Sequence, residues 1–569
     1  MLREYQLTNF KAFAGPETIP IRPITLIYGP NSSGKSSILQ SLLLLKQTLE
    51  EANSPIPLLP KGKLVDLGDY REFVHRHDVS NKFSFKALFA LGTEKAESLW
   101  VRQLLEATGS ALVGLNVDFA YDKKTETMVL SSVDVFVGDK SLPAISYSPI
   151  GKPRKRQLTL TIVEPENGFW DTWWTVTKQY MEEELEHGDV EYADYKGEVE
   201  NYPFKRLLQD LRNYSFEEAI EDLQEENWIL GINYENFLPV SSLPAKFLKK
   251  LEEFNPEEFE ERKKEILRRL IEILTGKAAQ TQQSQSSSSA DSPEKQSTED
   301  DSPFEAEIIY SGGTGKDSFE GGLDVSPITF HVCSVFRQLV KEMIYLGPLR
   351  SYPERYYTFS GNPSEQVGQS GEMLPDILFQ NSELLERVNA ELNRFGLGYE
   401  LKRDILRDDK SNPTNVFALR IVDKETGVSA SIRDVGFGVS QVLPVVVQSL
   451  LSHNKTLLIE QPEIHLHPAL QAELGDLFIQ SALGEQQNTF LLETHSEHLM
   501  LRILRRIRET TEGELDPGLT PVRPEQVAVL YVLPDKDGAK VVEIPIRPDG
   551  EFAERWPQGF FAERAKELF

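Results

Sequence analysis

Eight consecutive residues near the N-terminus have the composition and spacing of a loop that binds phosphate. They fit the pattern G-x-x-x-x-G-K-[ST] and read Gly29-Pro30-Asn31-Ser32-Ser33-Gly34-Lys35-Ser36. The glycines allow backbone N–H groups to curl around phosphate oxygens, and a helix that follows directs its positive end toward them. Lys35 is predicted to reach the β- and γ-phosphates of ATP, and the Ser36 hydroxyl to bind Mg²⁺. The residues predicted to bind the nucleotide here are Gly29, Asn31, Ser33, Gly34, Lys35, Ser36 and Ser37.

A second stretch, LLIEQPEIHLHP at residues 457–468, places carboxylates directly after an apolar run. An apolar strand that ends in Glu460 suits this residue for the Mg²⁺ shell, directly or through water. Sites that hydrolyse ATP usually carry a second carboxylate at such a strand end, but the next residue is the amide Gln461. On a strand, Glu463, His465 and His467 would share a face and could form a different metal site. Pro468 and the helix pattern after it favour a turn instead.

A glycine-rich loop before another helix pattern forms a second candidate anion site. Residues 431–441 read SIRDVGFGVSQ and precede the apolar helix pattern VLPVVVQSLL. Because one nucleotide does not need two such loops from one subunit, Gly438, Ser440 and Gln441 are predicted to bind the nucleotide of a neighbouring subunit. An ordinary helix cap is the alternative.

The strand pattern TFLLETH, residues 489–495, ends in His495. A histidine at this place could sense a γ-phosphate or orient water. The alternative is a structural histidine without a chemical role.

The elements that must position these residues are strands and helices in alternation. The apolar run ITLIY precedes the phosphate loop, and a helix pattern runs from Gly34 to about Glu50. Between Phe83 and Val163 several stretches alternate apolar and polar residues, which predicts a strand-rich lobe. The last third alternates strand and helix patterns, FALRIVD and TLLIE among the strands, which predicts a parallel sheet covered on both faces. The fold class is therefore α/β, a mostly parallel sheet flanked by helices.

Five segments are predicted along the chain. Residues 1–180 form an N-terminal half with the phosphate loop and the β-rich lobe, and residues 181–275 a charged helical insertion. Residues 276–303 are predicted to be a disordered linker, because the run from Ala278 to Asp301 has no large apolar residue. Residues 304–510 form a C-terminal half with the other motifs, and residues 511–569 a strand hairpin and a tail with the sequence WPQGFF.

Composition limits the classes of function. The 569 residues carry a formal net charge of −28, which argues against a surface that wraps nucleic acid throughout. Local basic patches remain possible at Lys152–Arg156 and along Arg502, Arg505 and Arg506, although surface solvation is the alternative for each. A single cysteine, Cys333, excludes an internal disulfide. The N-terminus does not look like a signal peptide, and no apolar stretch approaches the ~18 residues of a membrane span, which predicts a cytoplasmic protein.

The order of the motifs resembles the ATPase head of the ABC/SMC class, and within it the AAA-type ATPases related to RecF and to the overcoming-lysogenization-defect (OLD) proteins. The likeness covers roughly residues 1–75 and 330–510. It implies a P-loop NTPase fold and a head-to-tail homodimer with two ATP molecules between the subunits. Each ATP would contact Gly34, Lys35 and Ser36 of one chain and Gly438 and Ser440 of the other.

The resemblance also implies that Gln461 stands where the family has its water-activating glutamate. An amide can orient water but cannot accept its proton, and general-base catalysis is typically worth ~10²–10⁴-fold. We therefore expect slow hydrolysis, with Glu463 or His495 as substitute base. The candidate catalytic residues are Gln461, Glu463 and His495.

The expected function is an ATP-gated switch that acts with a separate nuclease or other effector on DNA, in genome maintenance or anti-phage defence. An ATP-dependent protein-interaction scaffold without nucleic-acid binding is the alternative. An OLD-like nuclease is disfavoured, because its metal-binding Asp-x-Asp matches only Asp535 and Asp537, which resemble a hairpin turn. The segment IYLGPLRSYPERYY and the ending WPQGFFAER also resemble a bacterial subfamily of these ATPases.

Overall fold

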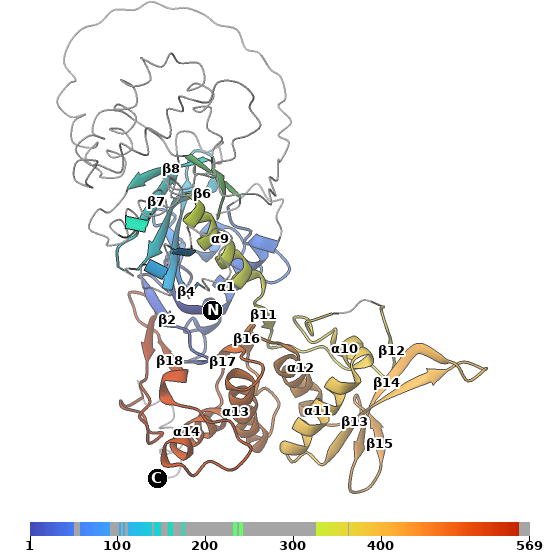
Figure 1. The fold of residues 1–569 in the computed structure, drawn as a ribbon. Coiled ribbons are helices and arrows are strands. Elements are labelled where there is room, and N and C mark those ends of the chain that lie inside the picture. Colours follow the sequence, from blue (N-terminus) through green and yellow to red (C-terminus); the bar gives the residue numbers. More distant parts are fainter. Residues whose placement is uncertain are drawn as a thin grey trace, which may run out of the picture.

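A six-stranded sheet forms the centre of the fold (Figure 1). The structure is a computed structural model, and it describes residues 1–50, 57–91, 112–138, 141–149, 157–162, 231–235, 238–242, 326–361 and 364–556, with short helical pieces between residues 102 and 176. Neighbouring strands are parallel from β11 to β18, and the edge pair β18–β19 is antiparallel. In spatial order the strands are β11 (Ile344–Leu346), β16 (Thr456–Glu460), β17 (Thr489–Glu493), β3 (Ile24–Tyr28), β18 (Val527–Leu533) and β19 (Lys540–Glu543). The predicted α/β class with a mostly parallel sheet is confirmed.

Both faces of this sheet are buried, which explains why its strands read as almost continuous apolar runs. Alternate side chains enter two separate cores: Ile27, Leu458 and Leu491 enter one, and Leu26 and Leu457 enter the other. The first core contains the helices α1 (Lys35–Glu50) and α9 (Ser326–Lys341). The second contains α12 (Phe437–Leu451), α13 (Pro468–Leu483) and α14 (Glu497–Glu512).

The predicted β-rich lobe is a nine-stranded antiparallel sheet in the order β10-β9-β8-β7-β6-β5-β4-β1-β2. It packs on α1 and α9: the Tyr5 hydroxyl donates to Ser41 Oγ at 3.1 Å, and the ring of Phe85 stacks on Phe336 at 5.7 Å. The lobe thereby holds the helix that begins at Lys35. Its strands are β1 (Leu2–Thr8), β2 (Glu17–Pro20), β4 (Phe83–Ala90), β5 (Leu112–Asp122), β6 (Thr127–Val137), β7 (Ile145–Pro149), β8 (Gln157–Ile162), β9 (Gly231–Glu235) and β10 (Leu238–Ser242).

Two of these strands correct the predicted boundaries. β9 and β10 lie within residues 181–275, for which the charge pattern predicts helices, and they extend the sheet of the N-terminal lobe. β9 pairs with β8, and β10 pairs with β9. The antiparallel sheet is thus extended by a segment that is distant in the sequence, and the local sequence does not predict this pairing. The rest of that segment and the predicted linker at residues 276–303 lie outside the described residues.

Between β11 and α12 in the sequence, the chain forms a side lobe that extends from the main body (Figure 1). FALRIVD was predicted to join the parallel sheet, but this prediction is wrong: the run lies in β14, antiparallel to β13. Asp408 closes the turn between them, because its Oδ1 accepts from the backbone N–H groups of Lys410 and Asn412. The lobe contains α10 (Leu374–Gln380), α11 (Ser382–Arg394), β12 (Tyr357–Thr358), β13 (Tyr399–Arg407), β14 (Pro413–Asp423) and β15 (Ser429–Ser431).

The C-terminal region has the predicted hairpin, β18–β19. Asp535 and Asp537 form its turn, where the N–H of Asp537 donates to Asp535 Oδ1 at 3.0 Å. Beyond the hairpin, the Trp556 ring packs edge-on against Tyr28 and Tyr531, so the start of the tail rests on the strand that precedes the phosphate loop. Residues 557–569, with the rest of WPQGFF, lie outside the described part of the chain. Among the described helices, none combines the length and the apolar character that a membrane span requires.

Candidate active site

The phosphate loop, residues 29–36, connects β3 to α1, and its shape requires glycine at two positions. Gly29 has a φ of +148° and Gly34 a φ of +110°, in a region that other residues rarely adopt. A Cβ at Gly29 would also lie 2.6 Å from the Val532 carbonyl oxygen, and one at Gly34 would lie 2.8 Å from the Ala12 Cβ. The loop therefore passes so close to Val532 and Ala12 that a side chain at either glycine would clash.

The polar groups of the loop fit a polyphosphate. The ammonium of Lys35 is buried and donates to the carbonyl oxygens of Gly29 at 3.0 Å and Pro30 at 2.8 Å. Burial lowers the pKa of Lys35, and the charge of Glu493 acts in the opposite direction. The Ser33 hydroxyl is buried, and it has no hydrogen-bond partner within the described ranges. These donors, with the N-terminus of α1, are the groups that phosphate oxygens need.

The other predicted residues of the loop differ in exposure. Asn31 is exposed at the loop tip, whereas Ser37 is buried in the first turn of α1, where its N–H donates to the Gly34 carbonyl at 3.0 Å. Ser36, the residue before Ser37, is half-buried.

Parallel pairing brings two carboxylates together beside the loop. Glu460 ends β16 and is paired in register with Glu493, which ends β17, and β17 is also the neighbour of β3. Glu493 therefore lies between the phosphate loop and Glu460. The Ser36 hydroxyl donates to Glu493 Oε1 at 3.0 Å. Glu493 Oε2 is buried, and no described residue hydrogen-bonds to it.

Sequence reasoning missed Glu493. Its signal is present in TFLLETH, which ends in a carboxylate just as TLLIE does. The carboxyl ends of parallel strands share one edge of a sheet, so two apolar strands that both end in glutamate predict a pair of carboxylates.

β11 and the residues that follow it hold Glu460 in place. Tyr345 donates its hydroxyl to Glu460 Oε1 at 2.8 Å, and the guanidinium of Arg350 donates twice to the Glu460 carbonyl oxygen at 3.2 Å. Burial, followed by the charge of Glu493, raises the pKa of Glu460 to about 7. A buried carboxyl with a nearby second carboxylate is the kind of site that favours a bound cation.

Gln461 and Glu463 lie in the turn that leaves β16. Gln461 has a φ of +46°, and its backbone N–H donates to the Glu493 carbonyl oxygen at 2.7 Å. Glu463 Oε1 accepts from the N–H of His495 at 2.7 Å, whereas Oε2 is buried and has no hydrogen-bond partner in the part of the chain that the structure describes. Burial raises the pKa of Glu463, which makes its carboxylate a better proton acceptor.

His495 follows β17 on the same edge of the sheet. Burial and then the charge of Lys35 lower its pKa, which favours the neutral imidazole. The structure thus brings Lys35, Ser36 and Glu460 together with Glu463 and His495, although the motifs that contain them lie more than 400 residues apart in the sequence. Their chemical roles stay predictions.

The second glycine loop, residues 431–441, begins α12. A Cβ at Gly438 would lie 2.9 Å from the His465 carbonyl oxygen, so this loop packs against the turn after Glu463. Ser440 and Gln441 are buried in their own chain, and Gln441 Nε2 has no hydrogen-bond partner. Contact of this loop with a neighbour's nucleotide stays a prediction.

The strand-like metal site that Glu463, His465 and His467 could have formed is not present. His465 lies in a turn with a φ of +63°, and His467 caps α13, where its Nδ1 accepts from Ala469 N at 3.3 Å. In the described residues, no group of three His, Cys, Asp or Glu side chains is placed to hold a metal ion by itself.

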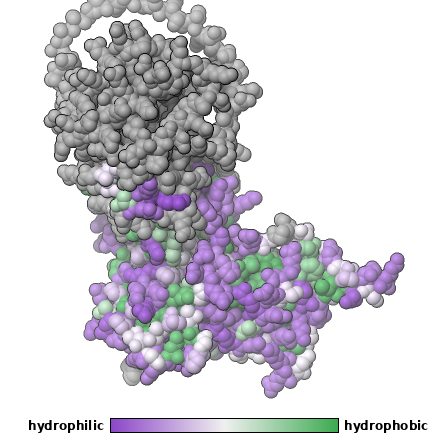
Figure 2. Space-filling view, viewed as in Figure 1, coloured by the Kyte–Doolittle hydropathy of each residue, from purple (hydrophilic) through white to green (hydrophobic). Residues whose placement is uncertain are grey.

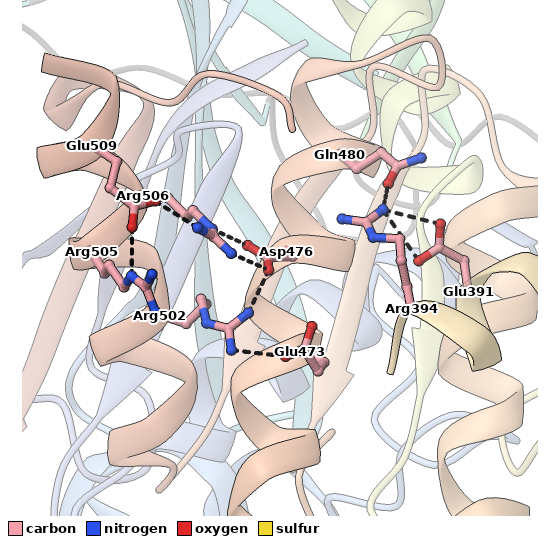
Figure 3. A network of polar contacts seen from close by, with 9 residues as sticks. All are labelled: Glu391, Arg394, Glu473, Asp476, Gln480, Arg502, Arg505, Arg506 and Glu509. Carbon is pink, nitrogen blue, oxygen red and sulfur yellow. Dashed lines mark hydrogen bonds and ion pairs between the residues drawn. The ribbon is translucent and has the colours of Figure 1, made fainter. Parts of the chain in front are cut away.

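Three arginines of α14, Arg502, Arg505 and Arg506, are paired within the chain (Figure 3). Arg502 and Arg506 both donate to Asp476 of α13, at 2.5 Å and 2.7 Å, and Arg505 pairs with Glu509 at 2.5 Å. These contacts neutralise the face that was a candidate for binding DNA. The other candidate, Lys152–Arg156, lies outside the described residues.

Comparisons with known proteins agree with this geometry. Residues 1–500 match the family described as AAA ATPase domain, and residues 522–569 match a family described as "Protein of unknown function (DUF3696)". No curated protein matched the chain.

Several solved Smc head domains are similar at low identity. The head from Pyrococcus furiosus, bound to the C-terminal domain of ScpA, is 11% identical with a TM-score of 0.35, and the match covers 100% of this chain and 98% of that chain. The head from Thermotoga maritima is 9% identical with a TM-score of 0.33, covering 96% of this chain and 99% of that chain.

Proposed function

The chain belongs to the AAA ATPase domain family, and on that basis we propose that it is a slow ATPase whose ATP-bound form is a homodimer that switches a separate effector. One observation carries the proposal. The phosphate loop, the ends of β16 and β17, and His495 meet at one sheet edge, where Gln461 occupies the place after the first strand-end carboxylate. Such a site binds ATP well and has an amide where a base is expected.

The loop residues would hold the triphosphate. Lys35 would exchange its two loop carbonyls for oxygens of the β- and γ-phosphates, and Ser33 would donate its buried hydroxyl. Ser36 and Glu460 would hold the accompanying Mg²⁺. When bound, this ion neutralises the charge that develops on the phosphates.

The residues around Gln461 account for slow turnover. The Gln461 amide can orient a water molecule but cannot take its proton. Glu463 has one carboxylate oxygen fixed by the His495 N–H and a second without a partner, so it can accept a proton. His495 is the alternative acceptor, since its lowered pKa keeps the imidazole neutral.

A surface beside the second glycine loop supports the dimer. Leu349 is 80% exposed, Tyr352 57% and Tyr356 55%, which is unusual for side chains of this size in one short segment. Arg433, just before the loop, lies over the Tyr352 ring at 5.2 Å. Arg355 pairs with Asp434 through two hydrogen bonds, of 2.7 and 2.8 Å.

These contacts join an exposed apolar segment to the loop that is predicted to reach the neighbour's nucleotide. Figure 2 shows a largely hydrophilic face with apolar area over the region of α10 and β12. A twofold dimer in which this loop faces the phosphate loop of a second copy would cover such a surface.

Lys35→Ala tests the proposal directly. Without the ammonium, the affinity for ATP should fall at least about tenfold, because a charged hydrogen bond to phosphate is lost. Sedimentation velocity should show that wild type dimerises with Mg-ATP and that Lys35→Ala stays monomeric. A wild type whose sedimentation and calorimetric titration ignore Mg-ATP would overturn the proposed function.

Leu349→Asp separates dimerisation from nucleotide binding. A charge in the centre of the surface should weaken the ATP-dependent dimer by ~10-fold or more, because the carboxylate would be desolvated on association. Binding of a fluorescent ATP analogue to the monomer should not change. Val428→Asp is a matched control, because Val428 is also highly exposed but lies in the β14–β15 turn. Equal loss in both variants would speak against this surface.

For the effector, the described surface favours a protein over DNA. Arg502 and Arg506 are already paired with Asp476, and the chain has a net charge of −28. A direct role on DNA, in genome maintenance or anti-phage defence, would be supported by DNA binding or DNA-stimulated hydrolysis at low salt. Absence of both would leave the effector protein as the target.

A further inference from the structure

We propose that Glu493 is a ligand of the divalent ion that accompanies ATP, and that it shares this role with Ser36. The inference rests on the proposed function, because the ion would enter the site with the nucleotide. It changes the expected ligand set, in which Glu460 supplies the carboxylate. It also gives a function to a residue that is absent from the predicted site residues.

The first support for Glu493 as a ligand is the order of the strands. β17 lies between β3 and β16, so Glu493 is one strand nearer to the phosphate loop than Glu460. The direct contact confirms this order, because the Ser36 hydroxyl donates to Glu493 Oε1 at 3.0 Å. The serine of a phosphate loop is the residue that binds Mg²⁺ in such sites. A carboxylate in contact with it is therefore within reach of the same ion.

The second carboxylate oxygen supplies independent support. Glu493 is only 4% exposed, and its Oε2 has no hydrogen-bond partner among the described residues. A buried carboxylate oxygen without a partner is costly, since charge is removed from water without compensation. A cation beside Ser36 would satisfy that oxygen.

Glu460 is less available for the ion. Its Oε1 accepts from the Tyr345 hydroxyl at 2.8 Å, and its backbone oxygen accepts from Arg350. Glu460 and Glu493 end neighbouring strands in register, so their charges repel one another. A divalent ion held mainly by Glu493 would relieve this repulsion and leave Glu460 in its contact with Tyr345.

The small number of protein ligands fits the ion. Mg²⁺ in nucleotide sites is usually held by one or two carboxylates together with substrate phosphates and water. Ser36, Glu493 and the neighbouring Glu460 are such a set. This also explains why the described residues contain no complete metal cluster of their own.

The test measures ion binding rather than hydrolysis. Mn²⁺ serves as the probe, and its free concentration is followed by electron paramagnetic resonance in the presence of a non-hydrolysable ATP analogue and excess protein. Glu493→Gln should raise the dissociation constant of Mn²⁺ by ~10-fold or more, because a carboxylate ligand becomes an amide. Glu525→Gln is the matched control, and it should bind Mn²⁺ as wild type does. Glu525 is exposed and precedes β18, so it lies at the opposite end of the parallel strands from Glu493.

The outcomes separate the two proposals. If Glu493→Gln binds Mn²⁺ as wild type does while Glu460→Gln loses it, Glu460 holds the ion and the inference fails, although the ATPase switch stands. If wild type does not bind the analogue at all, the proposed function fails first. Should Glu493→Gln melt far below wild type, Glu493→Asp keeps the charge, and it should bind Mn²⁺ more tightly than Glu493→Ala; equal affinity in the two would also overturn the inference.

Discussion

Gln461→Glu is expected to raise the steady-state ATPase rate by ~10²-fold, at the lower end of what general-base catalysis contributes. The substitution keeps the size of the side chain and converts an amide into a proton acceptor. The backbone of this residue is already fixed, because its N–H donates to the Glu493 carbonyl oxygen at 2.7 Å. The new carboxylate would therefore start from the place that the wild-type amide occupies.

The same variant should shorten the life of the dimer. If ATP holds two subunits together, faster hydrolysis releases them sooner, and the fraction of dimer with Mg-ATP should fall with time while a non-hydrolysable analogue keeps it constant. Phosphate release and sedimentation measured on the same sample check both effects. A dimer that persists after its ATP is consumed would disconnect hydrolysis from dissociation.

Glu463→Gln tests whether Glu463 is the general base in the wild-type protein. It removes the carboxylate oxygen that has no partner but keeps the acceptor for the His495 N–H. If Gln461→Glu fails to accelerate turnover while Glu463→Gln abolishes it, Glu463 is the base and the explanation of a slow switch loses its support. If Glu463→Gln retains activity, His495 is the next residue to replace.

The residues of the phosphate loop could be predicted because their chemistry is local. Glycine at 29 and 34, a lysine and a hydroxyl are required by the shape of one turn and the charge of one ligand, and all lie within eight residues. Glu460 and His495 could be placed beside them because apolar strands with polar ends alternate with helices, which implies a shared edge. For these residues the sequence predicts a place in the fold, while their chemical roles stay predictions.

The sequence does not predict that Glu493, rather than Glu460, is the carboxylate nearer to the phosphate loop. This position depends on the order of the strands in the sheet and not on the neighbours of Glu493 in the chain. In sequence, β16 precedes β17, yet in the sheet β17 lies next to β3 and separates it from β16. The side lobe was missed for a related reason. FALRIVD has the same apolar character in a parallel or an antiparallel sheet, and the turn at Asp408 decides between them.

Asp476→Asn is expected to lower the free energy of unfolding by about 3–5 kcal/mol, the usual cost of breaking a buried ion pair by removing one partner. Asp476 is 6% exposed and receives hydrogen bonds from both Arg502 and Arg506 (Figure 3). With an amide at this position, Arg502 and Arg506 would keep Glu473 and Glu509 but lose the buried charge that they share between α13 and α14. Urea denaturation, read by circular dichroism, measures the change.

Glu473→Gln is the matched control for this pair of helices. Glu473 also contacts Arg502, at 2.8 Å, but its side chain is 24% exposed, so its replacement should cost no more than about 1 kcal/mol. Similar losses in the two variants would show that burial does not strengthen the Asp476 contacts.

The pH dependence of stability follows from the same contacts. Burial alone would raise the pKa of Asp476, but the hydrogen bonds and charges of Arg506 and Arg502 outweigh it and hold this pKa below its ordinary value. A carboxyl with a lowered pKa in the folded state stabilises the protein above its unfolded pKa, about 3.9, and loses that contribution as the pH falls through the folded value. The difference in stability between wild type and Asp476→Asn should therefore be constant near pH 7 and shrink below about pH 4. A difference that stays constant down to pH 3 would mean that charge on Asp476 is not what joins the two helices.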